Sequence, residues 1–187
     1  QALIGTLSDE DARVRRRAVI ALGHIGTDAR DAVPALTELL DDPAVRTQAA
    51  DALRGMGSAA SSAVPKRIEA IKDESGDVSR AASEALGAIG SAAVTSLKKA
   101  MKNGNTHTRL RALNAFIHMG EDAARAVDEL AECLSDEDER VRFNAARALE
   151  KIGPEAKPAE AALHAALQDE DEDVRYWAGE ALRRIAG

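Results

Sequence analysis

Arginines that recur on one face of a repeated helix are the residues of this sequence best placed to act on another molecule. Val141–Gly153 is one copy of a repeated segment, and positions 2, 3, 6, 9 and 10 after its first residue define that face. Over all copies, four of these positions are acidic, namely Asp51, Glu84, Glu150 and Glu180. Nine are basic, namely Arg16, Arg17, Arg54, Arg80, Arg111, Arg147, Lys151, Arg183 and Arg184. This excess of positive charge, in a chain of net charge −7, predicts a groove for an acidic peptide or a phosphate backbone.

A simpler interpretation of these arginines stays open. Arginine is a good helix former, and exposed arginines commonly pair with neighbouring Glu and Asp side chains without binding a partner.

The few aromatic residues fall on the same face. Phe143 and Tyr176 hold equivalent positions in successive copies, Leu110 holds that position in the copy before, and Trp177 follows Tyr176. Neighbouring helices lie about 8–10 Å apart, so these side chains are expected to form a short apolar row that could anchor a partner. Alternatively, Trp177 only covers the end of the fold or contacts a further repeat.

No residue pattern in the sequence indicates catalysis or metal binding. The four histidines have no metal-ligand spacing, and acidic turns such as Ser135–Glu139 lack the glycine and the terminal glutamate of a calcium loop. Cys133 is expected to be a buried, unreactive thiol, because the second repeat has Leu39 at that position. We therefore predict a protein that is not an enzyme, with no catalytic, cofactor-binding or metal-binding residues.

The elements that position these side chains repeat about every 33 residues. The other copies of the segment are Val14–Gly26, Val45–Gly57, Val78–Gly90, Thr108–Gly120 and Val174–Ala186. Within each copy, positions 0, 4, 7, 8 and 11 are mostly apolar, which is the period of a helix that buries one face. A shorter helix precedes each copy, as in Val33–Leu40, and in the third repeat Arg67 interrupts its apolar face. Six units of two antiparallel helices are predicted.

Residue types at both ends of the second helix predict where it begins and ends. Capping side chains are expected three residues before each copy, at Asp11, Asp42, Ser75, Asn105, Asp138 and Asp171. Glycines that end the helices, such as Gly153, are expected in the left-handed conformation.

One arginine position is predicted to be structural. Position 1 holds Arg15, Arg46, Ser79, Arg109, Arg142 and Arg175. These arginines are expected to form a ladder with turn carboxylates of their own or the adjacent unit, and Ser79 breaks the ladder.

The pattern Asp-x-x-Val-Arg-x-x-Ala-x-x-Ala-Leu-x-x-Ile-Gly, preceded by a Val-Pro-x-Leu helix, resembles short HEAT repeats of the type also found in phycobilisome lyases. The resemblance implies an all-α solenoid, a superhelix of about six helix-turn-helix units whose second helices line a concave face. The expected single domain spans residues 1–187, with units at 1–26, 33–57, 64–90, 94–120, 127–153 and 160–187. The resemblance also leaves two alternative functions open, which are a bilin lyase-like enzyme or chaperone and a nucleic-acid-binding HEAT-like protein.

The predicted function is a non-catalytic scaffold that binds a protein partner, with an acidic segment, along the second helices. The predicted contact residues are Arg111, Phe143, Arg147, Lys151, Tyr176, Trp177 and Arg184. Nucleic acid is disfavoured by the net charge of −7, and the sequence has no apolar run of membrane-spanning length. A cytoplasmic monomer, or part of a larger chain, is expected.

Overall fold

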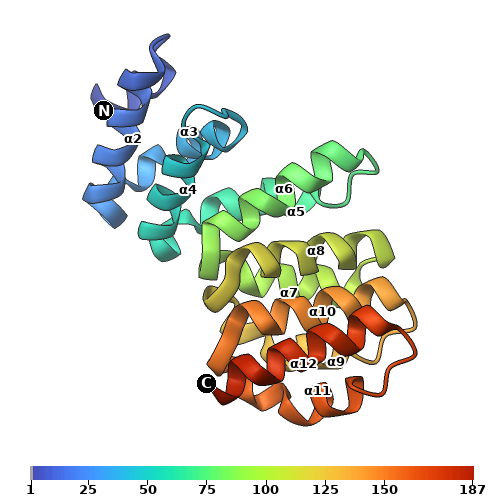
Figure 1. Ribbon diagram of the computed structural model, residues 1–187. Coiled ribbons are helices and arrows are strands. Elements are labelled where there is room, and N and C mark those ends of the chain that lie inside the picture. Colours follow the sequence, from blue (N-terminus) through green and yellow to red (C-terminus); the bar gives the residue numbers. More distant parts are fainter. Residues whose placement is uncertain (1) are drawn as a thin grey trace. The chain divides into compact units, whose positions relative to one another are not determined.

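Helices account for every regular element in the part of the chain that the computed structural model describes, which is residues 2–187 apart from the side chain of Ser58 (Figure 1). The chain divides into two compact units between Ala93 and Val94, within the turn that follows Gly90. Unit 1 is the part up to Ala93, and unit 2 is the part from Val94. Whether the six repeats form one domain stays a prediction.

Unit 1 contains three helix pairs, in which α2, α4 and α6 are the second helices. Its elements are α1 (Ala2–Gly5), η1 (Thr6–Ser8), α2 (Ala12–Ile25), η2 (Gly26–Ala32), α3 (Val33–Glu38), η3 (Leu39–Asp41), α4 (Arg46–Gly55), η4 (Gly57–Ala63), α5 (Val64–Ala70), α6 (Gly76–Ile89) and η5 (Gly90–Ala93). Helix α4 packs against both α2 and α6.

Unit 2 repeats this arrangement with α8, α10 and α12 as second helices. Its elements are α7 (Val94–Asn103), α8 (Thr106–Met119), η6 (Gly120–Ala126), α9 (Val127–Cys133), α10 (Glu139–Ile152), η7 (Gly153–Ala159), α11 (Glu160–Ala166) and α12 (Glu172–Ala186). The three second helices lie side by side in Figure 1, with α10 between the others. The predicted all-α solenoid of stacked helix pairs is confirmed.

The predicted apolar stripe forms the core. In α10, the residues Val141, Ala145, Ala148, Leu149 and Ile152 are all 0% exposed. Two of these five residues are alanine, which lets adjacent helices approach closely and explains a core with so few aromatic side chains. The helical phase inferred from the sequence is therefore correct.

Capping side chains hold the starts of four second helices as predicted. The carboxylates of Asp11, Asp138 and Asp171 and the amide oxygen of Asn105 accept backbone N–H groups of the first turn. The other two predictions were wrong in detail. Ser75 makes no side-chain cap. Asp42 accepts from the backbone of Ala44 and stabilises the turn before α4, because that helix begins only at Arg46.

The glycines that end the second helices need positive φ, but they are not in the predicted left-handed helical region. Gly26, Gly90, Gly120 and Gly153 have φ between 61° and 77° with ψ between −131° and −145°. Only glycine adopts this region readily, and here it turns the chain directly into a short 3₁₀ helix.

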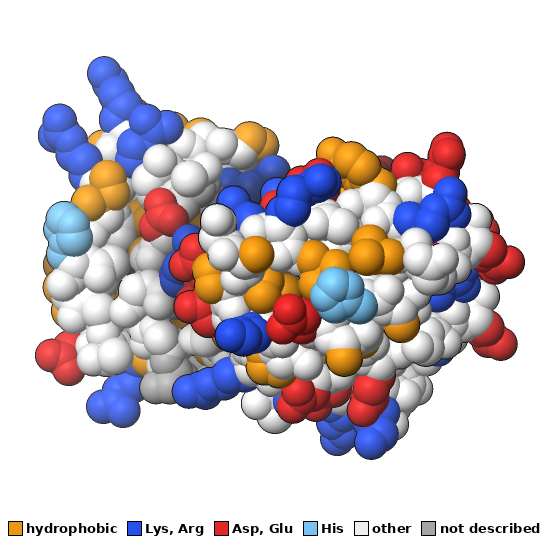
Figure 2. Space-filling model, turned by 60° about the horizontal axis from the view of Figure 1, so that its bottom comes forward, with side chains coloured by type: hydrophobic (Ala, Val, Ile, Leu, Met, Phe, Trp, Pro, Cys, Tyr) orange, Lys and Arg blue, Asp and Glu red, His pale blue; other side chains and the backbone are white. Residues whose placement is uncertain are grey.

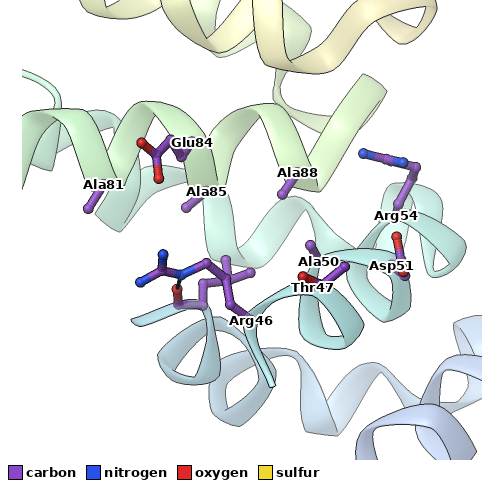
Figure 3. A pocket seen from close by; sticks show the side chains of 10 residues that line it. Arg46, Thr47, Ala50, Asp51, Arg54, Ala81, Glu84, Ala85 and Ala88 are labelled. Carbon is purple, nitrogen blue, oxygen red and sulfur yellow. Dashed lines mark hydrogen bonds between the residues drawn. The ribbon is translucent and has the colours of Figure 1, made fainter. Parts of the chain in front are cut away.

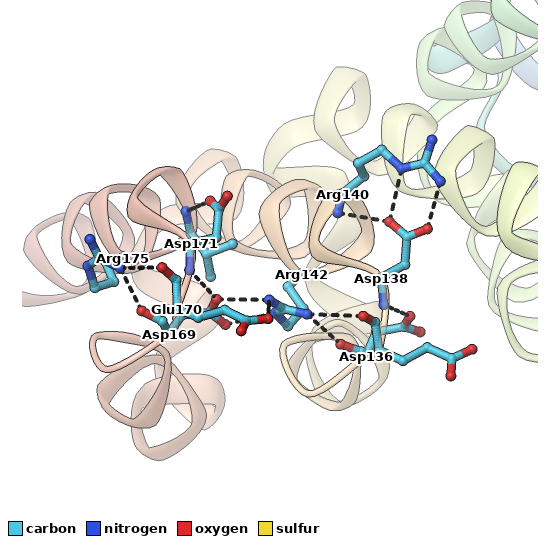
Figure 4. Close-up of polar contacts among 10 residues, drawn as sticks. Asp136, Asp138, Arg140, Arg142, Asp169, Glu170, Asp171 and Arg175 are labelled. Atoms are coloured by element: carbon cyan, nitrogen blue, oxygen red, sulfur yellow. Dashed lines mark hydrogen bonds and ion pairs between the residues drawn. The ribbon is translucent and has the colours of Figure 1, made fainter.

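The predicted arginine ladder is present at Arg15, Arg109 and Arg142, and Figure 4 shows its best-formed part. The prediction fails at Arg46 and Arg175, which donate only to backbone oxygens. Arg142 donates to Asp169 in the next pair at 2.8 Å and to the backbone oxygen of Asp136 in its own turn at 3.0 Å. Arg109 likewise reaches Asp136 at 2.9 Å, and Arg15 reaches Asp42 at 2.7 Å. Burial opposes ionisation of Asp169, but hydrogen bonds from Arg142 and from the Asp171 backbone hold its pKa below the ordinary value. Each such contact joins two successive helix pairs.

Arg67, which interrupts the apolar face of its helix, is buried with polar partners, although its Nε has no hydrogen-bond acceptor among the described residues. Its guanidinium is buried and donates to both carboxylate oxygens of Asp41, at 3.2 and 3.0 Å, and to the backbone oxygen of Thr37 at 2.7 Å. The aliphatic part of an arginine can fill an apolar position while its charged end finds partners. Arg67 therefore links the first helices of two pairs.

Arg142→Met should lower the free energy of unfolding by about 3 kcal/mol, because it leaves the Asp169 carboxylate buried without its counter-charge. The two side chains are only 8% and 9% exposed. Arg13→Met is the matched control, since Arg13 is 88% exposed in its pair with Asp11 and its loss should lower the free energy of unfolding far less. Urea unfolding monitored by circular dichroism measures both values, and equal losses would contradict a structural role for the ladder.

Cys133 is only half-buried, contrary to the prediction of a buried thiol, and we expect its environment to lower its reactivity. Its sulfur lies 3.6 Å from the Met101 sulfur, and desolvation, reinforced by the Asp136 carboxylate, raises the thiol pKa to about 11. The thiolate is the reacting form, so alkylation by iodoacetamide at mildly alkaline pH should be roughly a hundredfold slower than in the urea-unfolded chain. Mass spectrometry of timed samples gives both rates, and similar rates would show that the thiol is not protected.

Candidate interaction surface

The predicted contact residues lie on the second helices of unit 2. Phe143, Arg147 and Lys151 follow one another at intervals of four residues, so they share one face of α10. Tyr176, Trp177 and Arg184 come from the adjacent helix α12. The packing of α10 against α12, through the buried stripe beneath, brings the two sets together.

Phe143, Arg147, Tyr176 and Trp177 form what we call the Arg147 cluster. The guanidinium carbon of Arg147 lies 5.5 Å from the centre of the Phe143 ring and 5.3 Å from the centre of the Trp177 ring. Tyr176 meets Trp177 edge to face, with ring centres 5.3 Å apart. The predicted apolar row is thus interrupted by an arginine held between two aromatic rings, each contact contributing about 0.5–1 kcal/mol at an exposed site.

Arg147 has no carboxylate partner among residues 2–187, and its Nε atom is buried without an acceptor. Arg147 is otherwise only half-buried, while Tyr176 is 56% exposed. Contact with two rings restricts the side chain before any ligand arrives, so binding a carboxylate would cost less conformational entropy. This arrangement is suited to an acidic group flanked by an apolar one.

Glu150 organises a second group, the Glu150 cluster, which the sequence reasoning did not identify. Its carboxylate lies 3.1 Å from Lys151 and 4.0 Å from Arg184, and its side chain is only 12% exposed. Lys151 and Arg184 were predicted to contact a partner, but here both contact a carboxylate of the chain itself. Two cations around one carboxylate still leave a net positive charge beside the Arg147 cluster.

The remaining basic residues of the predicted face are partly engaged within the chain. Arg80 pairs with Glu84 and Asp77, Arg183 pairs with Glu180, and Arg16 donates to the backbone oxygen of Ala44. Arg111 is half-buried on α8. Figure 2, in which the bottom of the Figure 1 view is turned forward, shows both basic and acidic side chains on the surface drawn. The interpretation of these arginines as locally paired residues therefore holds for several of them.

Unit 1 presents a different second-helix surface. A groove of about 240 Å³ runs between α4 and α6, with a floor of Ala50, Ala81, Ala85 and Ala88 (Figure 3). Charged side chains from both helices stand at its edges, namely Arg46, Asp51, Arg54 and Glu84.

Residues 2–187 contain no group of three or more His, Cys, Asp or Glu side chains placed to hold a metal ion. No helix in the described chain is long and apolar enough to cross a membrane.

Comparison with known proteins places this geometry in a family. The family model for HEAT repeats matches residues 1–64, 41–117 and 94–183. No curated protein matches the sequence.

Solved structures with a similar fold include designed repeat proteins. An engineered protein is 25% identical, with a TM-score of 0.51 and coverage of 99% of this chain and 95% of that one. A computationally designed armadillo repeat protein for modular peptide recognition is 21% identical, with a TM-score of 0.52 and coverage of 98% of both chains. The complex of CpcE and CpcF of phycocyanin lyase from Nostoc is 26% identical at a TM-score of 0.41, covering 99% of this chain and 76% of that one. With its family model matched over nearly the whole length, the chain belongs to the HEAT-repeat family.

Proposed function

We propose that this protein is a non-catalytic scaffold whose second-helix surface in unit 2 binds an acidic segment of a protein partner. The observation that carries the proposal is Arg147, stacked between Phe143 and Trp177 without a carboxylate of its own among the described residues. Aromatic and arginine side chains dominate the binding energy of protein interfaces. The cluster combines both types at one point.

The partner contacts can be assigned to individual residues. Arg147 would pair with a carboxylate of the partner, while Tyr176, Trp177 and Phe143 would contact an adjacent apolar side chain. Lys151 and Arg184 already contact the Glu150 carboxylate, so they would not pair directly with the partner. Their combined charge exceeds that of Glu150, and they would attract the acidic segment through the remaining positive charge. Arg111, on the neighbouring helix α8, would contact the segment where it continues along the surface.

A peptide partner is favoured over nucleic acid. Binding to a phosphate backbone depends on many cations, whereas this chain has a net charge of −7 and several of its basic residues are paired internally. The alternatives make distinct predictions. Nucleic-acid binding requires an affinity that falls steeply with salt, and a bilin lyase-like activity requires a change in bilin absorbance on mixing.

Trp177 is the single tryptophan of the chain, so its fluorescence reports directly on this surface. Peptides that alternate Glu with Leu, and matched peptides with Gln in place of Glu, would be screened on an array and the best acidic binder titrated against the protein. We expect saturable binding with a change in Trp177 emission, and an affinity about tenfold lower for Arg147→Met, equivalent to about 1.4 kcal/mol.

Arg140→Met is the matched control, because Arg140 lies on the same helix but pairs with the capping residue Asp138. Its affinity should equal that of the wild type. Equal binding of the Gln peptides, or unchanged affinity in Arg147→Met, would remove the Arg147 cluster as the binding site.

A further inference from the structure

The junction between the second and third helix pairs of unit 1 lacks the ladder contact. Arg46 and Asp73 have the same repeat positions as Arg142 and Asp169, which pair between the α10 and α12 helix pairs. Arg46 donates through its Nε to the backbone oxygen of Leu40 at 2.7 Å, and no carboxylate in the described part of the chain pairs with its guanidinium. Asp73 is exposed, and its carboxylate accepts a backbone N–H of its own turn at 2.7 Å. Both residues of a ladder contact are present here, but they do not meet.

An exposed valine on α6 shows that the second helices are separated at this junction. Val174 has the same repeat position in α12, where its own pair and the pair of α10 cover it completely, and it is 0% exposed. Val78 in α6 also has its own pair and a preceding pair beside it, but it is 46% exposed. The preceding pair, that of α4, therefore covers α6 only in part.

The lengths of the two helices explain this partial cover. Helix α6 begins two residues before Val78, whereas α4 begins one residue after Val45, the equivalent valine. The first turn of α6 thus has no counterpart in α4, and Figure 1 shows α6 extending away from α4. The groove of about 240 Å³ with its alanine floor lies between these helices, and Arg46 is at its edge (Figure 3).

The first helices of the same two pairs are joined. The buried Arg67 guanidinium of α5 donates to the Asp41 carboxylate and to the backbone oxygen of Thr37, both in the pair before. Lys66, the neighbour of Arg67, pairs with Glu38 of α3. Two helix pairs that are joined along their first helices and separated along their second helices have the geometry of a hinge.

We propose that this junction has two arrangements, the open one of the structure and a closed one in which Arg46 pairs with Asp73. The axis of closure runs along α3 and α5, where the contacts of Arg67 are kept. Closure moves α4 toward the first turn of α6, so Val78 becomes covered and the groove between the helices narrows. The closed arrangement repeats the ladder contact that Arg142 makes in unit 2.

The hinge lies within unit 1 and does not depend on the proposed function, which concerns the Arg147 cluster of unit 2. It also determines when the alanine floor of the groove is accessible, because only the open arrangement leaves the space between α4 and α6. A ligand that binds in this groove would favour the open arrangement.

The test measures the distance across the junction by pulsed electron spin resonance between two spin labels. The labels are attached at Pro43→Cys and Glu74→Cys, in the exposed turns before α4 and α6, in a Cys133→Ser background. We expect two populations of distance, and Asp73→Arg should remove the shorter one because it places like charges together. Adding Arg46→Asp restores a pair with reversed charges, so the shorter distance should return in the double variant.

Labels at Glu10→Cys and Pro43→Cys provide the matched control, because they span the junction that the contact of Arg15 with Asp42 already closes. They should give one distance, which Asp73→Arg leaves unchanged. Thermal unfolding of each variant checks that the fold is kept. A distance distribution between α4 and α6 that neither charge reversal alters would overturn the proposal. So would a shorter distance that fails to return in the folded double variant.

Discussion

A single helix pair of this chain cannot bury its own apolar stripe, and this constraint determines most of the structure. The second helices are rich in alanine, so they must pack closely on a neighbour to exclude water from both sides. The approach is tight enough that a Cβ on Gly23 would lie 3.2 Å from Ala52 of the next second helix. Within each unit, every pair therefore supplies part of the core of the next.

This regularity is why the fold could be predicted well from the sequence alone. The residues that recur, such as Val141 and Leu149, belong to the apolar stripe in each copy. The repeat period fixes which face of the helix they occupy. The ladder was predictable for the same reason, since an arginine next to the buried anchor lies beside the turn of the following pair. Departures occurred where one copy differs from the others, as at Asp42, whose turn is shorter.

The candidate site was harder to predict because it depends on single residues rather than on the repeat. The aromatic residues were identified by position, but a contact of Arg147 with both Phe143 and Trp177 depends on side-chain rotamers. The four-residue spacing of Phe143 and Arg147 on one helix was the available signal. The contacts of Glu150 and Arg67 were not predicted for a related reason, because Arg184 and Asp41 come from other elements of the chain.

The glycines after the second helices have a stereochemical consequence. At Gly26, φ is 66° and ψ is −134°, which is the mirror image of the extended conformation that L-residues adopt most easily. The backbone at this point therefore has the handedness of a D-amino acid. In a chemically synthesised chain, D-alanine would match this conformation while reducing the freedom of the unfolded state. Ribosomal synthesis offers only the achiral residue for the same turn, and this restricts the position to glycine.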